Sequence, residues 1–449
     1  MDLCIRPGRA LRGQARMPGD KSIAHRALIA AALAEGTSTI RGFDPFDDAL
    51  RTLEALRACG VQIEAGGERE LRVTGRGLRG LASPAGMVDC GQSGTTMRLL
   101  AGVLAGQPVS ATLDGAEGLR RRPMGRVTEP LARMGARIEG PTLGRYAPFT
   151  VHGGSLRGID YTLSVASAQV KSAILLAALN AEGETVLREP APSRDHTERL
   201  LRRLGVPLEV GDGAIRCRPA RPWQGLTMEL PGDVSSAAFF LVAATLVDGS
   251  EVSIRDVGLN PTRTGVIDVL RAMGGAVEVA ARAAGPAEEP VGDLSVRGAE
   301  LRGVEIGGAL IPSLIDELPV LAVAATQARG TTAVRDAAEL RVKETDRIAA
   351  LAAELGRMGA AIETTPDGFL ISGPTPLRGA RVDAHGDHRT AMALAVAGLV
   401  AEGETVVAGA EAIGKSFPAF VATLRALGAR CEGRTQHATR NTQHAIRNT

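Results

Sequence analysis

The sequence contains few aromatic residues. Its 449 residues include only 8 Phe, 2 Tyr and 1 Trp. Proteins that bind single-stranded nucleic acid stack bases on aromatic side chains, so this composition argues against that class. Hydrophobic residues still make up 44% of the chain, so the core must be built from Ala, Leu, Val and Ile.

No excess of one charge sign is present either. The 52 Lys and Arg residues nearly balance 50 Asp and Glu, which leaves no overall field to hold nucleic acid or an anionic membrane. The five cysteines are scattered without a CxxC pair, which argues against a zinc site or a disulfide framework and favours buried, reduced thiols. No signal-like apolar run or stretch of about 18 apolar residues occurs. We therefore expect a cytoplasmic protein that binds neither nucleic acid nor a membrane.

A helix end followed by glycine and a short strand recurs along the chain, which indicates a repeat of about 70 residues. The glycines of this pattern are Gly60, Gly135, Gly205, Gly274, Gly359 and Gly428. A second set follows Ala- and Leu-rich segments, and we expect it to cap helices: Gly36, Gly106, Gly183, Gly249, Gly330 and Gly403. Each of six units is thus predicted to contain a helix, a strand, a helix and two further strands.

The six units are predicted to form two globular groups of three. An open solenoid would need unusual end repeats, which this chain lacks. The segment PWQGLTMELPGDVSS, with the only Trp and two prolines, separates the third unit from the fourth. The polar tail 433–449 repeats TQHATRN as TQHAIRN and is predicted to be disordered.

In the first half, residues that can bind anions lie where helices are predicted to begin. GDKSIAHR places Lys21 and Ser22 there, although Ser22 could equally serve as a helix N-cap. DCGQSGTTMR forms a glycine- and hydroxyl-rich turn around Gly94 without P-loop spacing, so no nucleoside triphosphate is implied. Three further segments add Arg120, Arg121, Arg122 and Arg126 (GLRRRPMGR), Ser167, Gln169 and Lys171 (SVASAQVK), and Arg194 and His196 (RDHTER). The arginine run could be a solvated surface, but its glycine-rich flank and the following Pro-Met pair favour a site.

The second half carries carboxylates beside cations at similar points of the repeat. They are Asp316 and Glu317 (LIDELP), Lys343, Glu344, Asp346 and Arg347 (RVKETDR), Asp387, His388 and Arg389 (DHR), and Lys415 (GKSFP). These groups could be simple caps and ion pairs. If like ends of the units align, however, the cations converge between the two halves, where a low dielectric strengthens each charge. The predicted ligand is small and multiply anionic, with Asp316 and Glu344 as proton carriers.

Nine motifs together resemble, in order, those of the 5-enolpyruvylshikimate-3-phosphate synthase family, also called 3-phosphoshikimate 1-carboxyvinyltransferase. They span residues 3–432: GDKSIAHR, GQSGTTMR, RRPMGR, SAQVKSA, RDHTE, LIDELP, KETDR, GDHRTAMA and GKSFP. The resemblance implies an α/β fold, a two-domain inside-out α/β barrel built from six βαβαββ-type repeats, three per domain. It implies one domain of residues 19–230, another of 1–18 and 231–432, and hinge strands at 18–20 and 228–232.

The resemblance also implies the reaction, which is transfer of the enolpyruvyl group of phosphoenolpyruvate to the 5-hydroxyl of shikimate 3-phosphate with release of phosphate. Neither a metal nor a redox cofactor is implied, and we expect a monomer. The residues implied to bind shikimate 3-phosphate are Lys21, Ser22, Arg26, Ser167, Ala168, Gln169, Arg194, Asp316 and Lys343. Those implied for phosphoenolpyruvate are Lys21, Gly94, Arg122, Gln169, Arg347, Arg389 and Lys415. Asp316, Glu344 and Lys21 are the implied catalytic residues, and Gln92 stands where the family usually has Asn.

Two alternatives are weighed against this interpretation. A UDP-N-acetylglucosamine 1-carboxyvinyltransferase of the same fold would normally have Asn after the first lysine and Cys in the loop DGAEGLRRRPMG, but here Ser22 follows Lys21 and the loop has no Cys. A noncatalytic repeat protein that only binds phosphorylated metabolites would not need Asp316 and Glu344 for turnover.

Overall fold

The structure, a computed structural model, describes residues 1–434. The predicted disordered tail began two residues too early, because Gly433 and Arg434 belong to strand β26 (Arg430–Arg434). They pair with Leu3 and Asp2 of β1 (Asp2–Arg6). The rest of the predicted tail lies outside the described residues.

Within residues 1–434, six four-stranded mixed sheets share one strand order. In each, an edge strand runs parallel to its neighbour, and two antiparallel strands follow. Three sheets lie in one lobe: β16 (Thr227–Glu229), β3 (Thr37–Arg41), β5 (Glu70–Thr74) and β4 (Gln62–Gly67); β6 (Val88–Asp89), β7 (Ser110–Asp114), β9 (Phe149–His152) and β8 (Arg137–Glu139); β11 (Asp160–Thr162), β13 (Thr185–Arg188), β15 (Ala214–Cys217) and β14 (Leu208–Gly211).

Three sheets lie in the other lobe: β2 (Arg12–Arg16), β17 (Glu251–Gly258), β19 (Val291–Arg297) and β18 (Ala276–Ala281); β20 (Glu305–Ile306), β21 (Gly330–Val334), β23 (Gly368–Gly373) and β22 (Ala361–Thr365); β24 (Arg381–Asp383), β25 (Thr405–Ala408), β1 and β26. The N-terminal strand β1 therefore completes the sheet of the last unit. A short parallel pair, β10 (Leu156–Arg157) and β12 (Ala181–Glu182), adds to the first lobe.

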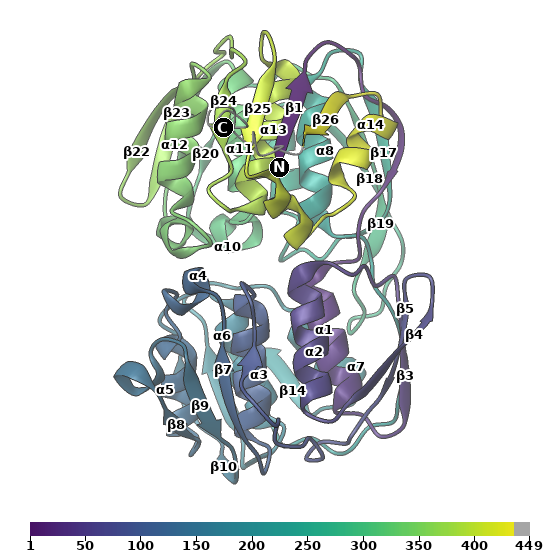
Figure 1. Ribbon diagram of the computed structural model, residues 1–449, viewed down its shortest axis with the longest axis vertical. Helices are drawn as coiled ribbons and strands as arrows, with labels where there is room; N and C mark the ends of the chain where they lie inside the picture. Colours follow the sequence, from purple (N-terminus) through teal and green to yellow (C-terminus); the bar gives the residue numbers. More distant parts are fainter. Residues whose placement is uncertain (435–449) are drawn as a thin grey trace, which may run out of the picture.

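Six apolar helices occupy the interiors of the two lobes (Figure 1), and almost all of their residues are buried. They are α1 (Lys21–Ala32), α3 (Gly94–Ala105) and α6 (Ala168–Ala178) in the first lobe, and α8 (Val234–Leu246), α11 (Leu318–Gln327) and α13 (His388–Val400) in the second. α3 packs against α6 and α1, and α8, α11 and α13 pack against one another. Their Ala-rich sequences allow this close packing, since small side chains let helix backbones approach. Within residues 1–434, no single helix is long and apolar enough to span a membrane, and only the bent pair Gly308–Leu314 and Leu318–Gln327 passes that test jointly, across a 111° break.

Six amphipathic helices, one for each repeated unit, end at the first set of repeated glycines. Each glycine lies one residue beyond the helix C-cap and has a φ between 77° and 111°. Glycine adopts this left-handed conformation without steric cost, which explains its recurrence. The helices are α2 (Asp47–Ala58), α5 (Gly125–Arg133), α7 (His196–Arg203), α9 (Gly265–Ala272), α12 (Arg347–Arg357) and α14 (Phe420–Ala426).

The expectation that the second glycine set caps helices is correct only for Gly106, the C-cap of α3. The other five interior helices have their C-caps at Leu33, Leu179, Val247, Ala328 and Ala401. The five remaining glycines have a φ between 70° and 95° and lie at or just before the start of the next strand. They are therefore needed for the turn into the strand rather than for the helix end.

The two lobes have separate hydrophobic cores. One core draws its buried residues from positions 24–230, and the other from 3–17 and 234–431. The chain crosses twice between the lobes, and the two crossing segments pair: Asp20 N donates to Pro231 O at 2.8 Å, and Asp233 N donates to Pro18 O at 2.9 Å. Asp20 and Asp233 then cap α1 and α8, so each crossing segment leads directly into an interior helix.

Short helices complete the described residues: α4 (Glu117–Arg120), α10 (Ile311–Leu314), and the 3₁₀ helices η1 (Pro141–Gly144), η2 (Gly308–Leu310), η3 (Ala338–Val342) and η4 (Ala410–Lys415).

Candidate active site

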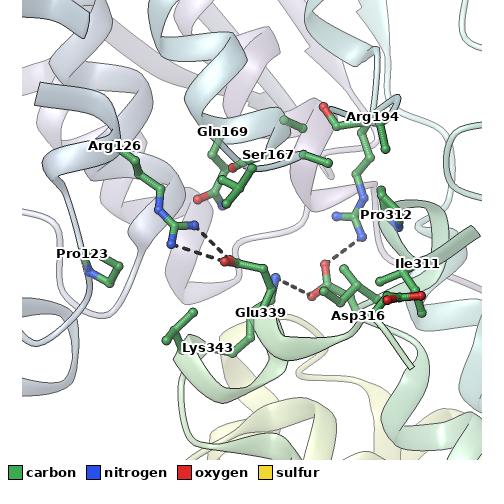
Figure 2. A pocket seen from close by; sticks show the side chains of 18 of the residues that line it. Pro123, Arg126, Ser167, Gln169, Arg194, Ile311, Pro312, Asp316, Glu339 and Lys343 are labelled. Atoms are coloured by element: carbon green, nitrogen blue, oxygen red, sulfur yellow. Dashed lines mark hydrogen bonds and ion pairs between the residues drawn. The ribbon is translucent and has the colours of Figure 1, made fainter. Parts of the chain in front are cut away.

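A cavity of about 330 Å³ lies between the lobes and is lined from both sides (Figure 2). Seven of the predicted site residues line it: Arg122, Ser167, Ala168, Gln169, Arg194, Asp316 and Lys343. Other predicted residues contact these, as described below. The predicted convergence of charged residues between the two halves is thus found in the structure.

Helix starts supply many of these groups. Gly94 begins α3, Ala168 begins α6 with Ser167 as its N-cap, and Arg347 begins α12. Lys21 and His388 likewise begin α1 and α13. The first turn of a helix has unpaired N–H groups and a partial positive charge, which add to the side-chain cations in attracting anions.

Asp316 is the centre of an ion-pair cluster that crosses the cavity. Its Oδ2 accepts from Arg194 Nη2 at 2.7 Å, and its Oδ1 lies 3.1 Å from Arg347 Nη1 and 3.3 Å from Lys343 Nζ. Burial alone would raise the pKa of Asp316, but the charges of Lys343, Arg389, Arg194 and Arg347 outweigh it and hold the pKa well below the ordinary value. Asp316 is therefore ionised in the protein without ligand.

Glu344 does not line the cavity, but it shares a partner with Asp316. Arg347 Nη2 donates to Glu344 Oε2 at 2.7 Å, and Arg122 Nη1 lies 3.6 Å from Glu344 Oε1 across the cleft. Burial favours a raised pKa for Glu344, yet the positive charges of Arg347 and Arg122 hold its pKa well below the ordinary value. Arg347 is 1% exposed and also donates to Asp387 Oδ2 at 2.8 Å, so it is firmly oriented between the carboxylates.

Arg389 approaches the same cluster from α13. Its Nη1 donates to the backbone O of Asp316 at 3.1 Å and to Glu317 Oε1 at 3.3 Å. Glu317 is fully buried and also accepts from Ser235 Oγ. Arg389 is therefore oriented by the residue next to Asp316.

Gly94 makes room for two guanidinium groups at the start of α3. A Cβ atom there would lie 2.9 Å from Arg122 Nη1 and 3.0 Å from Arg98 Nη1. Arg98 in turn donates to Gln169 Oε1 at 2.5 Å, and Gln169 Nε2 donates to Thr95 Oγ1 at 2.8 Å. The glycine thus allows cationic groups to lie directly over a helix N-terminus.

Three predicted residues at the start of α1 have different surroundings. Lys21 Nζ pairs with Asp48 Oδ2 at 2.9 Å. The alternative of Ser22 as an N-cap is wrong, because Asp20 caps α1 and Ser22 Oγ accepts from Arg263 Nη1 at 3.3 Å. Arg26 does not line the cavity; its guanidinium donates to Thr197 and Ser172 hydroxyls and to Ser22 O.

Lys415 and Gln92 also lie outside the lining of the cavity. Lys415 Nζ donates to Gly386 O at 2.7 Å. The Gln92 side chain extends over Gly118, where a Cβ would meet Gln92 Oε1 at 2.9 Å.

The arginine run 120–126 separates into two groups because it folds as a short helix and a turn. Arg120 pairs with Asp114 and Arg121 with Glu117, away from the cavity. Arg122 and Arg126 instead line the cavity. Among the charged lining residues, Arg126 was one of the sequence candidates for anion binding, whereas Arg98, Asp336 and Glu339 were not. Arg98 lies in the first turns of α3, which was a usable signal, but no sequence signal distinguished Asp336 or Glu339.

The described residues 1–434 contain no group of three or more His, Cys, Asp or Glu side chains arranged to hold a metal ion. The five cysteines are free and buried, as predicted.

Comparison with known proteins decides the family. A family model described as EPSP synthase (3-phosphoshikimate 1-carboxyvinyltransferase) matches residues 5–424. The chain belongs to the EPSP synthase family. The resemblance found in the nine motifs is therefore confirmed.

Curated EPSP synthases are similar to the chain over nearly its whole length. The 3-phosphoshikimate 1-carboxyvinyltransferase of Citrifermentans bemidjiense is 53% identical over 417 residues, which cover 93% of this chain and 97% of that protein. The enzyme of the same name from Pelotomaculum thermopropionicum is 52% identical over 94% of this chain and 97% of its own length.

Solved structures give the same result. The EPSP synthase of Acinetobacter baumannii superposes with a TM-score of 0.85 and 42% identity, covering 96% of this chain and 99% of that chain. The enolpyruvyl transferase NikO from Streptomyces tendae has a TM-score of 0.78 at 20% identity, over 96% of this chain and 98% of its own, and shows the shared fold alone.

Proposed function

We propose that the cavity between the lobes binds shikimate 3-phosphate and phosphoenolpyruvate side by side. As a member of the EPSP synthase family, the protein transfers the enolpyruvyl group of phosphoenolpyruvate to the 5-hydroxyl of shikimate 3-phosphate and releases phosphate, a step of aromatic amino acid biosynthesis. The observation that carries the residue assignment is the pair of ionised carboxylates, Asp316 and Glu344, which share Arg347 and face cations from both lobes.

Shikimate 3-phosphate is assigned to the side of the cavity formed by α6, Arg194 and Asp316. The start of α6 offers the Ser167 hydroxyl and free N–H groups to the phosphate. Arg194 and Lys343 add positive charge, since their ion-pair partner Asp316 is one carboxylate shared among several cations. The other residues proposed for this substrate are Lys21, Ser22, Arg26, Ala168 and Gln169.

Phosphoenolpyruvate is assigned to the side near Gly94, Arg122 and Arg347. Its carboxylate and phosphate suit guanidinium groups, which bind planar or tetrahedral oxyanions through paired N–H donors. Gly94 lets the Arg122 and Arg98 guanidinium groups lie over the start of α3, where they can bind such an anion. The other residues proposed for this substrate are Lys21, Gln169, Arg389 and Lys415.

The chemistry assigns one proton transfer to each carboxylate. Asp316 takes the proton of the 5-hydroxyl while the hydroxyl oxygen bonds to C2 of phosphoenolpyruvate, and Glu344, with Lys21, delivers a proton to C3. In the elimination C3 returns a proton to Glu344, the C2–O bond to phosphate breaks, and the phosphate leaves with the proton that Asp316 had taken. Binding of the anionic substrate to Arg122 and Arg347 weakens their hold on Glu344, which raises its proton affinity when the reaction requires an acid.

The wider architecture belongs to the same proposal. The common strand order of the six sheets, the buried helices and the two separate cores support a two-domain inside-out barrel of six repeats, with domains 19–230 and 1–18 plus 231–432. The paired crossing segments support hinges at 18–20 and 228–232, so that closure expels water from the reacting groups. Five free, buried thiols fit a cytoplasmic enzyme, and we propose that it acts as a monomer.

The test is phosphate release by the purified protein with phosphoenolpyruvate and either shikimate 3-phosphate or UDP-N-acetylglucosamine. We expect release only with shikimate 3-phosphate, and a loss of roughly 10²–10⁴-fold in kcat for Glu344→Gln. Glu278→Gln, which alters an exposed ion pair with Arg297, is the matched control and should retain activity. Release with the UDP-sugar alone would move the substrate assignment, and an unchanged kcat for Glu344→Gln would remove Glu344 from the mechanism.

A further inference from the structure

Lys171 was one of the sequence candidates for anion binding, but it does not line the cavity. It follows the N-cap Ser167 by one turn of α6, and its side chain is 1% exposed. The proposed function gives this buried cation no role. Its contacts show instead which part of the site it holds.

The ammonium group of Lys171 contacts three oxygen atoms. Its Nζ lies 2.8 Å from Glu189 Oε2 and 2.7 Å from Glu198 Oε1, and it donates to the backbone O of Ser193 at 3.1 Å. An ammonium group has three N–H donors, so these contacts use all of them. Ser193 Oγ also donates to Glu189 Oε1, which ties the two ends of residues 189–193 to each other as well as to Lys171.

The segment held in this way belongs to the cavity. Residues 189–195 connect β13 to α7 and have no regular secondary structure. They nevertheless supply Ala191, Ser193 and Arg194 to the lining. Figure 2 shows Arg194 extending to Asp316, which it contacts at 2.7 Å. Since neither a helix nor a strand fixes this segment, side-chain contacts must set its position.

Lys171 joins the two parts of the proposed shikimate 3-phosphate site. One part is the start of α6 with Ser167, and Lys171 lies on the same helix. The other part is Arg194, which directly follows the carbonyl group that Lys171 holds. On the far side of Arg194, Asp195 accepts from Asn260 Nδ2 of the second lobe at 2.6 Å, a contact that does not involve α6. The Lys171 contacts therefore set the position of Arg194 relative to α6.

Loss of Lys171 would also affect stability. Glu198 is 3% exposed, and its Oε2 is buried without a hydrogen-bond partner. Burial raises the pKa of Glu198, and the charge of Lys171 opposes that shift. A test of positioning must therefore separate the placement of Arg194 from the cost of leaving a buried carboxylate unpaired.

We propose that Lys171 is a positioning residue for shikimate 3-phosphate, which fixes Arg194 relative to the start of α6. The inference rests on the proposed function, because it takes this substrate to bind at α6, Arg194 and Asp316. Misplacement of a binding group by about an ångström can cost ~10²-fold. Phosphoenolpyruvate is assigned to the side near Gly94, so its binding should change little.

The first test is Lys171→Met, which keeps an unbranched side chain and removes all three contacts. We expect KM for shikimate 3-phosphate to rise by about tenfold or more and KM for phosphoenolpyruvate to stay within about twofold. The kcat should stay within about threefold, because Asp316 keeps Lys343 and Arg347 as partners. Steady-state kinetics with each substrate varied in turn measures these values.

A second variant separates positioning from stability. Lys171→Met should lower Tm by roughly 6–12 °C, because Glu198 keeps an unpaired buried charge. Addition of Glu198→Gln removes that charge, so at least about half of the lost Tm should return while KM for shikimate 3-phosphate stays raised. Glu198→Gln alone should leave both KM values within about twofold, because Lys171 still holds Glu189 and Ser193.

Gln107→Leu is the matched control. Gln107 is fully buried and follows the C-cap of α3, at the opposite end of that helix from Gly94. Its Nε2 donates to Leu78 O at 2.7 Å, so it also fixes a backbone segment, but one that does not line the cavity. This variant should lower Tm and leave both KM values unchanged.

Amide hydrogen exchange of the ligand-free proteins, followed by mass spectrometry, measures the segment directly. We expect peptides that cover residues 189–195 to exchange about tenfold faster in Lys171→Met, with or without Glu198→Gln, and at the original rate in Gln107→Leu. Inactivity of the original protein with both substrates would contradict the proposed function, whereas unchanged exchange in Lys171→Met would overturn the role of Lys171 itself.

Two kinetic results would also overturn this role. An unchanged KM for shikimate 3-phosphate in Lys171→Met, or an equal rise in both KM values, would show that Lys171 does not position this substrate's site. Recovery of KM together with Tm in the double variant would show that Lys171 acts through stability alone.

Discussion

Replacement of Asp316 by asparagine should separate the structural and the chemical contributions of this residue. The substitution keeps the shape of the side chain but removes the charge that Arg194, Lys343 and Arg347 share. Arg347 keeps Asp387 and Glu344 as partners. Within residues 1–434, Arg194 and Lys343 have no other ion-pair partner, so two partly buried cations lose theirs.

Removal of one partner from a buried ion pair costs about 3–5 kcal/mol, because the remaining charge stays desolvated. The low end applies here, since the cavity admits water and the asparagine carbonyl can still accept one hydrogen bond. A loss of about 3 kcal/mol corresponds to a fall in Tm of roughly 6–12 °C for a lobe of this size. The kcat should fall by roughly 10²–10⁴-fold, because the 5-hydroxyl loses its base.

Thermal unfolding followed by circular dichroism measures the first effect, with Glu278→Gln as an exposed control that should change Tm by less than about 2 °C. Inorganic phosphate should raise the Tm of Asp316→Asn more than that of the original protein, because the anion replaces the lost carboxylate between Arg194 and Lys343. An unchanged Tm without phosphate would refute the claim that these ion pairs stabilise the cleft, and equal phosphate effects would refute the claim that the freed cations bind an anion.

Three further predictions follow from single sites. Gly94→Ala should raise KM for phosphoenolpyruvate, by less than the ~10²-fold that a misplacement of about an ångström can cause, because the added Cβ displaces the Arg122 and Arg98 guanidinium groups by only a few tenths of an ångström. An unchanged KM in steady-state kinetics would contradict the packing described. Lys415→Ala should weaken the binding of phosphoenolpyruvate, because the proposed function brings this residue to the substrate when the lobes close. An unchanged affinity in calorimetric titration of the variant would remove Lys415 from the proposed site. Burial lowers the pKa of His25 to about 3, so below about pH 6.5 the unfolded chain binds a proton that the folded protein excludes. The free energy of unfolding should therefore fall by about 1.4 kcal/mol for each pH unit from pH 6.5 downward. Urea titrations at several pH values should show that this free energy depends less on pH in His25→Asn than in the original protein.

The sequence predicted those features of the fold that repeat in the chain. Gly60 and its five equivalents each follow the end of a helix and have a positive φ. Because glycine adopts this conformation most readily, the helix ends could be recognised in the sequence. The role of Gly36 was misjudged because glycine serves both helix ends and turns into strands, and its spacing alone does not separate these uses. The completion of the last sheet by β1 depends on pairing between the two ends of the chain, which no local pattern encodes.

The site was predictable where its residues begin helices, as with Gly94, Ser167 and Arg347. Partners across the cleft were not, because their contacts join positions far apart in the chain. Arg126 and Glu339 are 213 positions apart and belong to different lobes. Charge and residue type alone could not show that Arg122 faces the cavity while its neighbour Arg121 pairs with Glu117.

The most direct test of the account is a turnover experiment in D₂O with phosphoenolpyruvate and shikimate 3-phosphate, followed by ³¹P and ¹H nuclear magnetic resonance. Protonation of C3 followed by loss of a C3 proton predicts one equivalent of phosphate per equivalent of product, with deuterium in the vinylic CH₂ group. Glu344→Gln should slow the appearance of both signals by the same factor, roughly 10²–10⁴-fold. Product formed by the original protein without deuterium at that carbon would contradict the proton transfer assigned to Glu344, and with it the central claim that the cleft works by addition and elimination.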